Sequence, residues 1–157
     1  MEHVNYKIWN IVVVLKEGQI LLIERRKGDF GGYVPPGGKV DFPEAFMESA
    51  VRELREETGL VAKSIRLAGV SSYINEQKRE QFMYMDYLCT DFEGELLVNG
   101  PEGRCSWFDA KALPELPMNA HIKQRVQLVL THASYELQHV WDEETDQVVE
   151  EKLFVAK

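Results

Sequence analysis

The stretch GGKVDFPEAFMESAVRELREETGL, residues 37–60, predicts a tight glycine turn followed by an amphipathic helix. We expect Asp41 or a neighbour to cap the helix, Pro43 to lie in its first turn and Gly59 to end it. An apolar stripe along this helix is formed by Met47, Ala50, Val51 and Leu54. Such a stripe predicts that the helix packs on a sheet and exposes its polar face.

The polar face carries Glu53, Glu56 and Glu57, which share one arc of the helix because they are spaced i, i+3 and i+4. Like charges at this spacing repel by a few tenths of a kcal/mol per pair, and the helix dipole disfavours anions near its carboxyl end. Mg²⁺ favours such clustered oxygens and keeps positions open for substrate phosphates. The arc is therefore either a metal site or a solvated acidic face, partly neutralised by Arg52 and Arg55.

A longer pattern around these glutamates distinguishes the two interpretations. Its spacing is G-x5-E-x7-R-E-U-x-E-E-x-G-U, where U is a bulky aliphatic residue. The nine positions are Gly38, Glu44, Arg52, Glu53, Leu54, Glu56, Glu57, Gly59 and Leu60. A full chance match in a chain this short has a probability on the order of 10⁻⁷ or less at ordinary residue frequencies. The pattern resembles the Nudix box of the Nudix hydrolases, and nearly the whole chain is similar to their MutT-like branch.

This resemblance implies the Nudix fold, an α/β (α+β) architecture in which an α/β/α sandwich surrounds a mixed central sheet. It also implies hydrolysis of a nucleoside diphosphate linked to another moiety, with Mg²⁺ or Mn²⁺ as the cofactor. The implied metal ligands are the carboxylates of Glu53, Glu56 and Glu57 and the carbonyl of Gly38. In the implied catalytic set, Arg52 orients the glutamates, Glu44 braces the loop or reaches the metals through water, and Glu53 or Glu56 accepts the proton, with Glu53 favoured.

Candidate residues also lie outside the box. Glu102 is either a further metal ligand or base, as in MutT-like chains, or a solvent-exposed loop residue, and Glu95 is a weaker stand-in. Asn119 resembles a base-reading residue and is equally suited to cap the following helix. Gly37 permits close backbone approach to the cations. Further candidates are Arg25 and Arg26 for the phosphates, and Pro36 with Phe30 or Tyr33 for an apolar base pocket.

The MutT-like resemblance implies conversion of a (deoxy)nucleoside triphosphate, with 8-oxo-dGTP as a candidate, to the monophosphate and pyrophosphate. A departure puts one mode of base recognition in doubt, because Met118, Asn119 and His121 stand where animal oxidised-purine hydrolases carry a Trp and paired aspartates. The alternatives are a Nudix hydrolase of ADP-ribose, a nucleotide sugar or a dinucleoside polyphosphate, and a non-catalytic nucleotide sensor.

The remaining elements follow from hydrophobic periodicity. Strands are predicted at residues 8–15, 20–25, 81–90 and 106–108, and a helix at 120–131. Residues 27–38 form a glycine-rich loop. A C-terminal hairpin is predicted from strands 135–141 and 147–154 around an acidic turn at 142–146. Because strands and helices mix without strict alternation, we expect a mixed sheet with helices packed on it.

Composition restricts the class of protein. With 157 residues and a net charge of −8, the chain is expected to form one domain over residues 1–157. The acidic balance argues against a stable nucleic-acid partner. No run is long enough to span a membrane, the first five residues lack an export signal, and Cys89 and Cys105 are expected to stay reduced. We predict a cytoplasmic protein with a small-molecule nucleotide substrate; dimers are common in the family it resembles.

Overall fold

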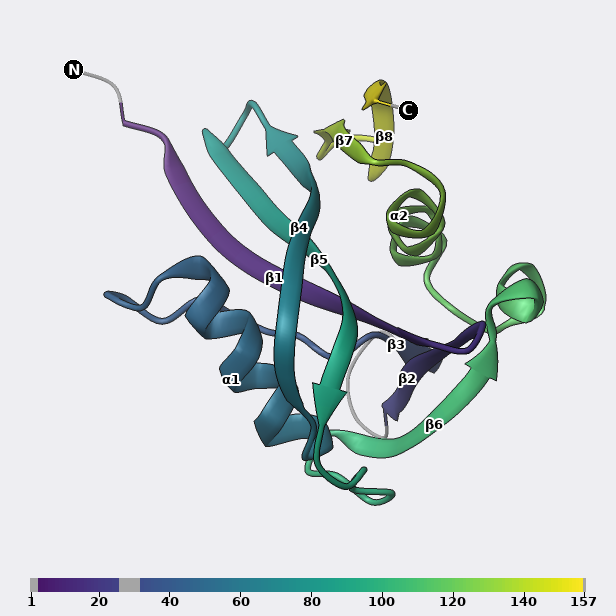
Figure 1. Ribbon diagram of the computed structural model, residues 1–157. Coiled ribbons are helices and arrows are strands. Elements are labelled where there is room, and N and C mark those ends of the chain that lie inside the picture. The colour runs from purple at the N-terminus through teal and green to yellow at the C-terminus, as the bar shows by residue number, and fades with distance from the viewer. Residues whose placement is uncertain (1–2, 26–31, 157) are drawn as a thin grey trace.

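A mixed β-sheet occupies the centre of the computed structural model, which describes residues 3–25 and 32–156 (Figure 1). The strands are β1 (Asn5–Lys16), β2 (Gln19–Arg25), β3 (Gly32–Val34), β4 (Val61–Asn75), β5 (Glu80–Glu93), β6 (Gly103–Asp109), β7 (Ser134–Asp142) and β8 (Gln147–Ala156). The helices are α1 (Phe46–Thr58), the short 3₁₀ helix η1 (Ala110–Glu115) and α2 (Ala120–Thr131). Within the described residues, no helix combines the length and apolar character needed to cross a membrane.

The strand order is β3-β2-β1-β5-β4-β7-β8, and β6 pairs with β2. β1 runs parallel to β5 and β4 runs parallel to β7, whereas the other pairs are antiparallel. α1 packs against β1 and β4, and α2 packs against β4, β5 and β7. The mixed sheet, the helices on its two faces and the terminal β7–β8 hairpin confirm the predicted architecture.

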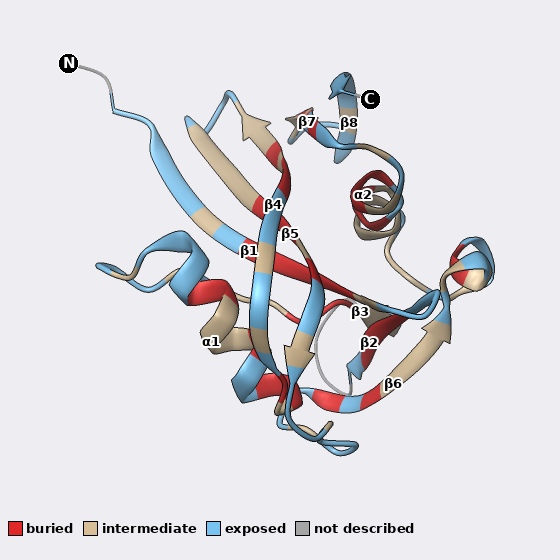
Figure 2. Ribbon diagram, in the orientation of Figure 1, coloured by how far each residue is buried: buried red, intermediate tan, exposed pale blue. Residues whose placement is uncertain are grey.

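Alternation along β1 divides the core into two layers. Val12 and Val14 point toward α1, where they join the cluster that contains Leu54, while Ile11 and Val13 join the cluster under α2 that contains Val126. These side chains are at most 8 % exposed, and Figure 2 shows the buried band that crosses the centre of β1. Burying each such side chain stabilises the fold by about 1.5–3 kcal/mol. The two helices therefore pack on opposite faces of the sheet, and alternate side chains of β1 contribute to both cores.

The predicted start of the first helix is wrong. α1 begins at Phe46 with Ala45 as its N-cap, and the Glu48 carboxylate accepts a hydrogen bond from the Ala45 N–H at 3.0 Å. Asp41 and Pro43 instead lie in a separate turn, in which the Glu44 N–H donates to the Asp41 carbonyl at 2.7 Å. The helix starts later than predicted because residues 41–44 close a turn of their own, in which the Asp41 N–H also donates to Glu44 Oε1 at 3.1 Å. The Glu44 side chain contacts Arg52 from this turn. Gly59 ends α1 in the left-handed conformation, as predicted, with φ 79°.

Other predictions hold with longer boundaries. The helix at 120–131 and the terminal hairpin are present, and the strands are extended by a few residues at their ends. β4 was not predicted from periodicity because bulges shift its register against β5 near Ser64 and between Leu67 and Gly69, which interrupts the alternation of apolar residues. β3 and η1 were also not predicted, since each is too short to carry a periodic signal.

A buried ion pair joins α2 to the sheet. Arg125 donates from Nη2 to Asp86 Oδ1 at 2.6 Å and from Nε to Oδ2 at 3.3 Å. Ser71 and Tyr135 also donate hydroxyl hydrogen bonds to Asp86 Oδ2. The guanidinium lies 4.1 Å from the centre of the Tyr84 ring. Because Asp86 is fully buried and Arg125 is 3 % exposed, neither charge can turn to solvent if its partner is lost.

We expect Asp86→Ala to lower the free energy of unfolding by about 3–5 kcal/mol, because the substitution leaves the buried arginine without its counter-charge. Urea denaturation at neutral pH measures the change. The control is Lys63→Ala in the exposed Lys63–Glu93 pair, where the distance is 3.8 Å, and it should cost less than about 1 kcal/mol. Similar denaturation midpoints for the two variants would contradict this account.

Candidate active site

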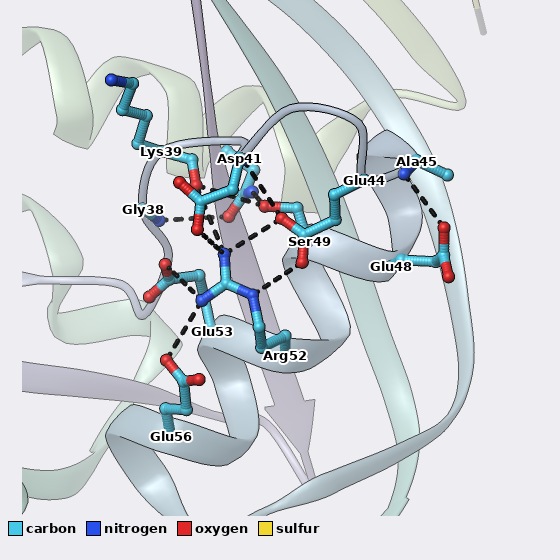
Figure 3. A network of polar contacts seen from close by, with 11 residues as sticks. Gly38, Lys39, Asp41, Glu44, Ala45, Glu48, Ser49, Arg52, Glu53 and Glu56 are labelled. Atoms are coloured by element: carbon cyan, nitrogen blue, oxygen red, sulfur yellow. Dashed lines mark hydrogen bonds and ion pairs between the residues drawn. The ribbon is translucent and has the colours of Figure 1, made fainter.

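Arg52 organises the carboxylates on α1 (Figure 3). Its guanidinium donates to both oxygens of Glu44, from Nε at 2.7 Å and from Nη2 at 3.0 Å. Nη1 donates to Glu53 at 3.0 Å and to Glu56 at 3.1 Å, and Asp41 completes the group with an ion pair at 3.3 Å. The guanidinium holds the pKa of Glu44 at about 2. Glu44 therefore stays ionised and fixes Arg52, which in turn orients Glu53 and Glu56.

Glu57 lies on the same helix in a different environment. Its side chain is buried, and Oε2 accepts a hydrogen bond from the Gly37 N–H at 3.0 Å. Burial raises its pKa to about 8; the negative charges of Glu53 and Glu102 add to this shift, and the Gly37 N–H and, less strongly, Arg25 oppose it. Without a cation, Glu57 is therefore largely protonated at neutral pH.

The Gly37–Gly38 segment passes closely between β1 and α1. A Cβ on Gly37 would lie 2.2 Å from the Asn10 carbonyl oxygen, and a Cβ on Gly38 would lie 2.6 Å from the Glu53 carboxyl carbon. Gly37 is required sterically because its Cβ would meet backbone, whereas a Cβ on Gly38 would displace the Glu53 carboxylate from its position beside the backbone. The backbone can thus lie against the Glu53 and Glu57 carboxylates at the same time.

Asn10 holds this segment in place and was not singled out from the sequence. Its side chain donates to Ser49 Oγ at 3.1 Å and accepts from the Gly38 N–H at 3.2 Å, while its backbone N–H donates to the Gly38 carbonyl at 2.8 Å. Asn10 is only 2 % exposed. Its position as an amide within the aliphatic run of residues 8–15 is the signal that could have identified it.

The donors fit a hard divalent cation. Glu53 and Glu57 flank the Gly37–Gly38 backbone, whereas Glu56 turns toward Arg52 and is half-exposed. Within residues 3–25 and 32–156, no three acidic, histidine or cysteine side chains form a group that could hold a metal by themselves. Mg²⁺ commonly uses one or two protein carboxylates and completes its shell with water and substrate phosphates. A cation here would also offset the like charges that raise the pKa of Glu57.

A groove of about 1310 Å³ extends from Glu57 across the α2 face of the sheet, and Glu53 and Glu56 are not among the described residues that line it. Gly37, Gly38, Glu57, Glu102 and Arg25 line it, which brings the predicted loop glutamate and arginine to the same groove as the box. Glu95 is not among the described residues that line the groove. Its large aromatic lining residues are Trp9, Tyr73, Phe82, Tyr84 and Trp141. The groove is therefore suited to a ligand that combines phosphates with a planar ring.

Several predictions for the groove wall can be compared with the structure. The predicted Pro36 and Tyr33 are not among the described residues that line the groove; Val34 and Pro35 line it instead, and Tyr33 packs on Phe108 with 4.8 Å between ring centres. The predicted candidates Arg26 and Phe30 lie outside the described residues. The aromatic residues of the groove were not predicted, because they are distant in sequence and converge only when β1, β4, β5 and β7 pair.

Asn119 acts as the N-cap of α2. Its Oδ1 accepts hydrogen bonds from the backbone N–H groups of His121, at 2.9 Å, and Ile122, at 3.3 Å. The capping interpretation is therefore confirmed. Asn119 also lines the groove, so a base-reading role stays a prediction.

We expect the melting temperature of the metal-free protein to fall, through Glu57, as the pH rises from about 4.5 to about 8. The folded-state pKa of Glu57, about 8, lies above the ordinary glutamate value of about 4.5, so the folded state binds the extra proton and loses stability as pH rises. Mg²⁺ should raise the melting temperature more at the higher pH, where it does not displace a proton. Calorimetry on wild type and Glu57→Gln measures both effects, and an identical pH and Mg²⁺ response in the variant would contradict the assignment.

Comparisons with known proteins agree with this geometry. The NUDIX domain profile matches residues 7–129. The structure is similar to a MutT protein from Bacillus halodurans, with a TM-score of 0.80 and 28 % identity, covering 94 % of this chain and 97 % of that one. The oxidized purine nucleoside triphosphate hydrolase of Danio rerio is 29 % identical over 109 residues, or 69 % of each chain.

Another relative carries a different activity in its name. The ADP-ribose pyrophosphatase of Methanocaldococcus jannaschii is 34 % identical over 105 residues, which cover 66 % of this chain and 62 % of that protein. The match therefore spans less than two thirds of that relative, and the names of the relatives do not agree on a substrate. The profile match over most of the sequence, however, establishes the family: this chain belongs to the NUDIX domain family.

Proposed function

We propose that the chain is a single-domain, metal-dependent pyrophosphohydrolase that converts a (deoxy)nucleoside triphosphate, with 8-oxo-dGTP as a candidate, to the monophosphate and pyrophosphate. The observation that carries this proposal is the Arg52-organised carboxylate group beside buried Glu57, at the edge of a groove with aromatic lining. Similarity to the oxidized purine nucleoside triphosphate hydrolase of Danio rerio over 69 % of the chain supports the triphosphate as substrate. The ADP-ribose pyrophosphatase relative makes ADP-ribose the second candidate.

The proposed cofactor is Mg²⁺, with Mn²⁺ as a substitute. When bound, it supplies charge neutralisation of the phosphate oxygens and activation of a water molecule. Glu53, Glu57 and the Gly38 carbonyl would hold it, with Glu56 and Glu102 as further ligands from the exposed side. The Gly38 carbonyl already accepts a hydrogen bond from the Asn10 N–H, and its second lone pair is the one proposed for the metal. We place this chemistry in the cytoplasm.

We assign the proton-accepting role to Glu53. Partial burial raises its pKa while Arg52 opposes the shift, and the side chain remains next to the Gly38 backbone. A carboxylate with a raised pKa is a better proton acceptor at neutral pH. Glu56 is half-exposed and fits this role less well. Arg52 orients Glu53, while Glu44 fixes Arg52 from the other side.

Arg25 and Gly37 are proposed to contact the substrate at the phosphate end of the groove, since both line it near Glu57. The nucleoside would extend toward the aromatic residues, with Asn119 on the α2 side. Its side-chain oxygen is occupied by the helix cap, so the amide hydrogens would contact the base. We propose that the scissile phosphate bond lies at the Glu57 end of the groove, where Glu53 flanks the neighbouring Gly38 backbone.

A substrate panel with Mg²⁺ tests the proposal: standard nucleoside triphosphates, 8-oxo-dGTP, ADP-ribose, a nucleotide sugar and a dinucleoside polyphosphate. We expect triphosphate cleavage to monophosphate and pyrophosphate, lowered about 10²-fold or more in kcat by Glu53→Gln. The matched control is Glu48→Gln on the same helix, outside the Arg52 contacts, which should retain activity. Turnover of ADP-ribose alone would contradict the triphosphate substrate but leave the proposed catalytic site intact. Tight nucleotide binding without any turnover would favour a non-catalytic nucleotide sensor.

A second test separates the two roles of Asn119. Asn119→Asp keeps a capping oxygen, so the melting temperature should change little. The variant loses the amide donors and gains a negative charge beside the base, so we expect KM for the preferred triphosphate to rise about tenfold or more while kcat changes less. Asn119→Ser provides a neutral cap for comparison. Unchanged KM in both variants would leave Asn119 as a cap alone.

A further inference from the structure

The floor of the groove extends beyond the first turn of α2. In that turn, His121 contacts the Tyr73 ring, with 5.5 Å between ring centres, and the His139 ring, with 4.9 Å. Tyr73 and His139 are neighbours in the strand register, and Asn75 and Trp141 are paired two residues further along the same strands. Side chains two residues apart on a strand point to the same face. Asn75 and Trp141 therefore continue the floor past the start of the helix.

This end of the floor is distant from the box. The strand register places Trp141 level with Asn5, three strands away. Asn5 lies five residues along β1 from Asn10, whose N–H donates to the Gly38 carbonyl. At about 3.3 Å per residue and about 4.8 Å per strand, Trp141 is about 17 Å along the strands and about 14 Å across them from that contact.

The groove has more space than one small ligand needs. Its volume is about 1310 Å³, whereas a pocket for a single drug-sized ligand encloses about 300–1,000 Å³. The residues proposed to contact the phosphates and the base are Arg25, Gly37 and Asn119. The end of the groove around Trp141 is therefore available to a further part of the ligand.

We call this end the distal pocket, and the groove residues that form it are Asn75, Lys78, Glu80, Phe82, Trp141 and Glu143. Its aromatic residues offer a surface for a ring. Trp107 stacks on Phe92, with 5.8 Å between ring centres, whereas no aromatic ring within residues 3–25 and 32–156 packs on Trp141. Trp141 is therefore suited to pack on a ring that belongs to a ligand.

Two chain turns hold the distal pocket together. Asn75 and Lys78, at the connection between β4 and β5, each contact the Glu143 carboxylate at 3.0 Å. Gln77 donates to the Asp142 carboxylate at 3.2 Å. The charge of Lys78 is thus balanced within the wall of the pocket. An uncharged ring therefore fits this end of the groove better than a further phosphate does.

The hairpin that carries Trp141 lies outside the domain matched by the profile. The NUDIX match ends at residue 129, whereas β7 and β8 run from Ser134 to Ala156. Trp141 and Glu143 are thus additions of this chain to the groove of the shared domain.

We propose that the distal pocket binds an uncharged aromatic substituent carried on the base of a nucleoside triphosphate. The inference rests on the proposed function, because a base that lies beside Asn119 with its phosphates near Glu57 directs its far edge along the floor toward Trp141. A substituent on that edge would then pack on the Trp141 ring. The chain would accordingly favour nucleotides with enlarged bases over the unmodified ones.

Calorimetric titration with N⁶-benzyl-AMP and AMP in the presence of Mg²⁺ tests the pocket without requiring hydrolysis. The benzyl group extends from the adenine edge opposite the ribose. We expect N⁶-benzyl-AMP to bind about tenfold more tightly than AMP, as one aromatic contact provides. Trp141→Ala should abolish this advantage, whereas Trp141→Phe, which keeps a ring, should retain most of it.

The matched control is Phe154→Ala in the same hairpin. Phe154 is 62 % exposed and pairs with Glu136, on the face opposite to Trp141, so this variant should keep the full advantage of the benzyl group. Thermal unfolding verifies that each variant is folded. Wild-type protein that binds N⁶-benzyl-AMP no more tightly than AMP, or an equal advantage in Trp141→Ala, would overturn the proposal.

Hydrolysis of N⁶-benzyl-ATP and ATP separates the distal pocket from the proposed function. We expect the benzyl group to raise kcat/KM by a similar factor, mainly through KM. Cleavage of both triphosphates without the Trp141-dependent preference would keep the proposed function and refute the pocket. The preference in binding without cleavage of either triphosphate would refute the proposed function and keep the pocket.

Discussion

The gathering of carboxylates around Arg52 is the constraint on which this structure depends. Glu44, Glu53 and Glu56 share one guanidinium, while Glu57 is buried one turn further along the helix. Such crowding of negative charge near a helix carboxyl end destabilises a helix considered by itself. The local elements offset it: the turn before α1 provides Glu44, the glycine segment leaves space for the carboxylates, and Asn10 fixes that segment to β1.

The groove depends in the same way on the position of α2. Packing alone would permit α2 to slide on the sheet, but the Arg125–Asp86 pair requires a particular position because both charges are buried. Arg125 also lies against Tyr84, which lines the groove. The wall that carries Asn119 and the floor that carries Tyr84 are therefore fixed to each other by one ion pair. The carboxylate end and the ring-binding end of the groove are positioned by separate polar networks on opposite helices.

The sequence alone predicted what is local and periodic. Helix 120–131 and the terminal hairpin show regular apolar spacing, and the box glutamates have an unusual charge pattern on one helix arc. The start of α1 was misplaced because Asp41 and Pro43 satisfy the usual rules for helix starts, whereas residues 41–44 close a turn of their own, from which Glu44 contacts Arg52. The bulged β4 has no clear alternation, and the Arg125–Asp86 pair joins residues 39 positions apart. Neither the bulged strand nor the distant ion pair produces a pattern that can be recognised in a single sequence.

The charge of the groove constrains the form in which a substrate enters. Its acidic lining residues are Glu57, Glu80, Glu102, Glu143 and Asp146, and its basic ones are Arg25, Lys78 and Arg125. Arg125 is paired with Asp86 and Lys78 with Glu143, so their charges are already balanced. Glu57 is largely protonated before a cation binds, and Glu80 and Glu143 are paired with Lys7 and Lys78. The groove therefore presents Glu102 and Asp146 against the single arginine Arg25, in a chain whose net charge is −8, and a polyphosphate that enters it meets net repulsion. A polyanionic substrate is therefore compatible with this groove only together with divalent cations, which the same carboxylates are suited to bind.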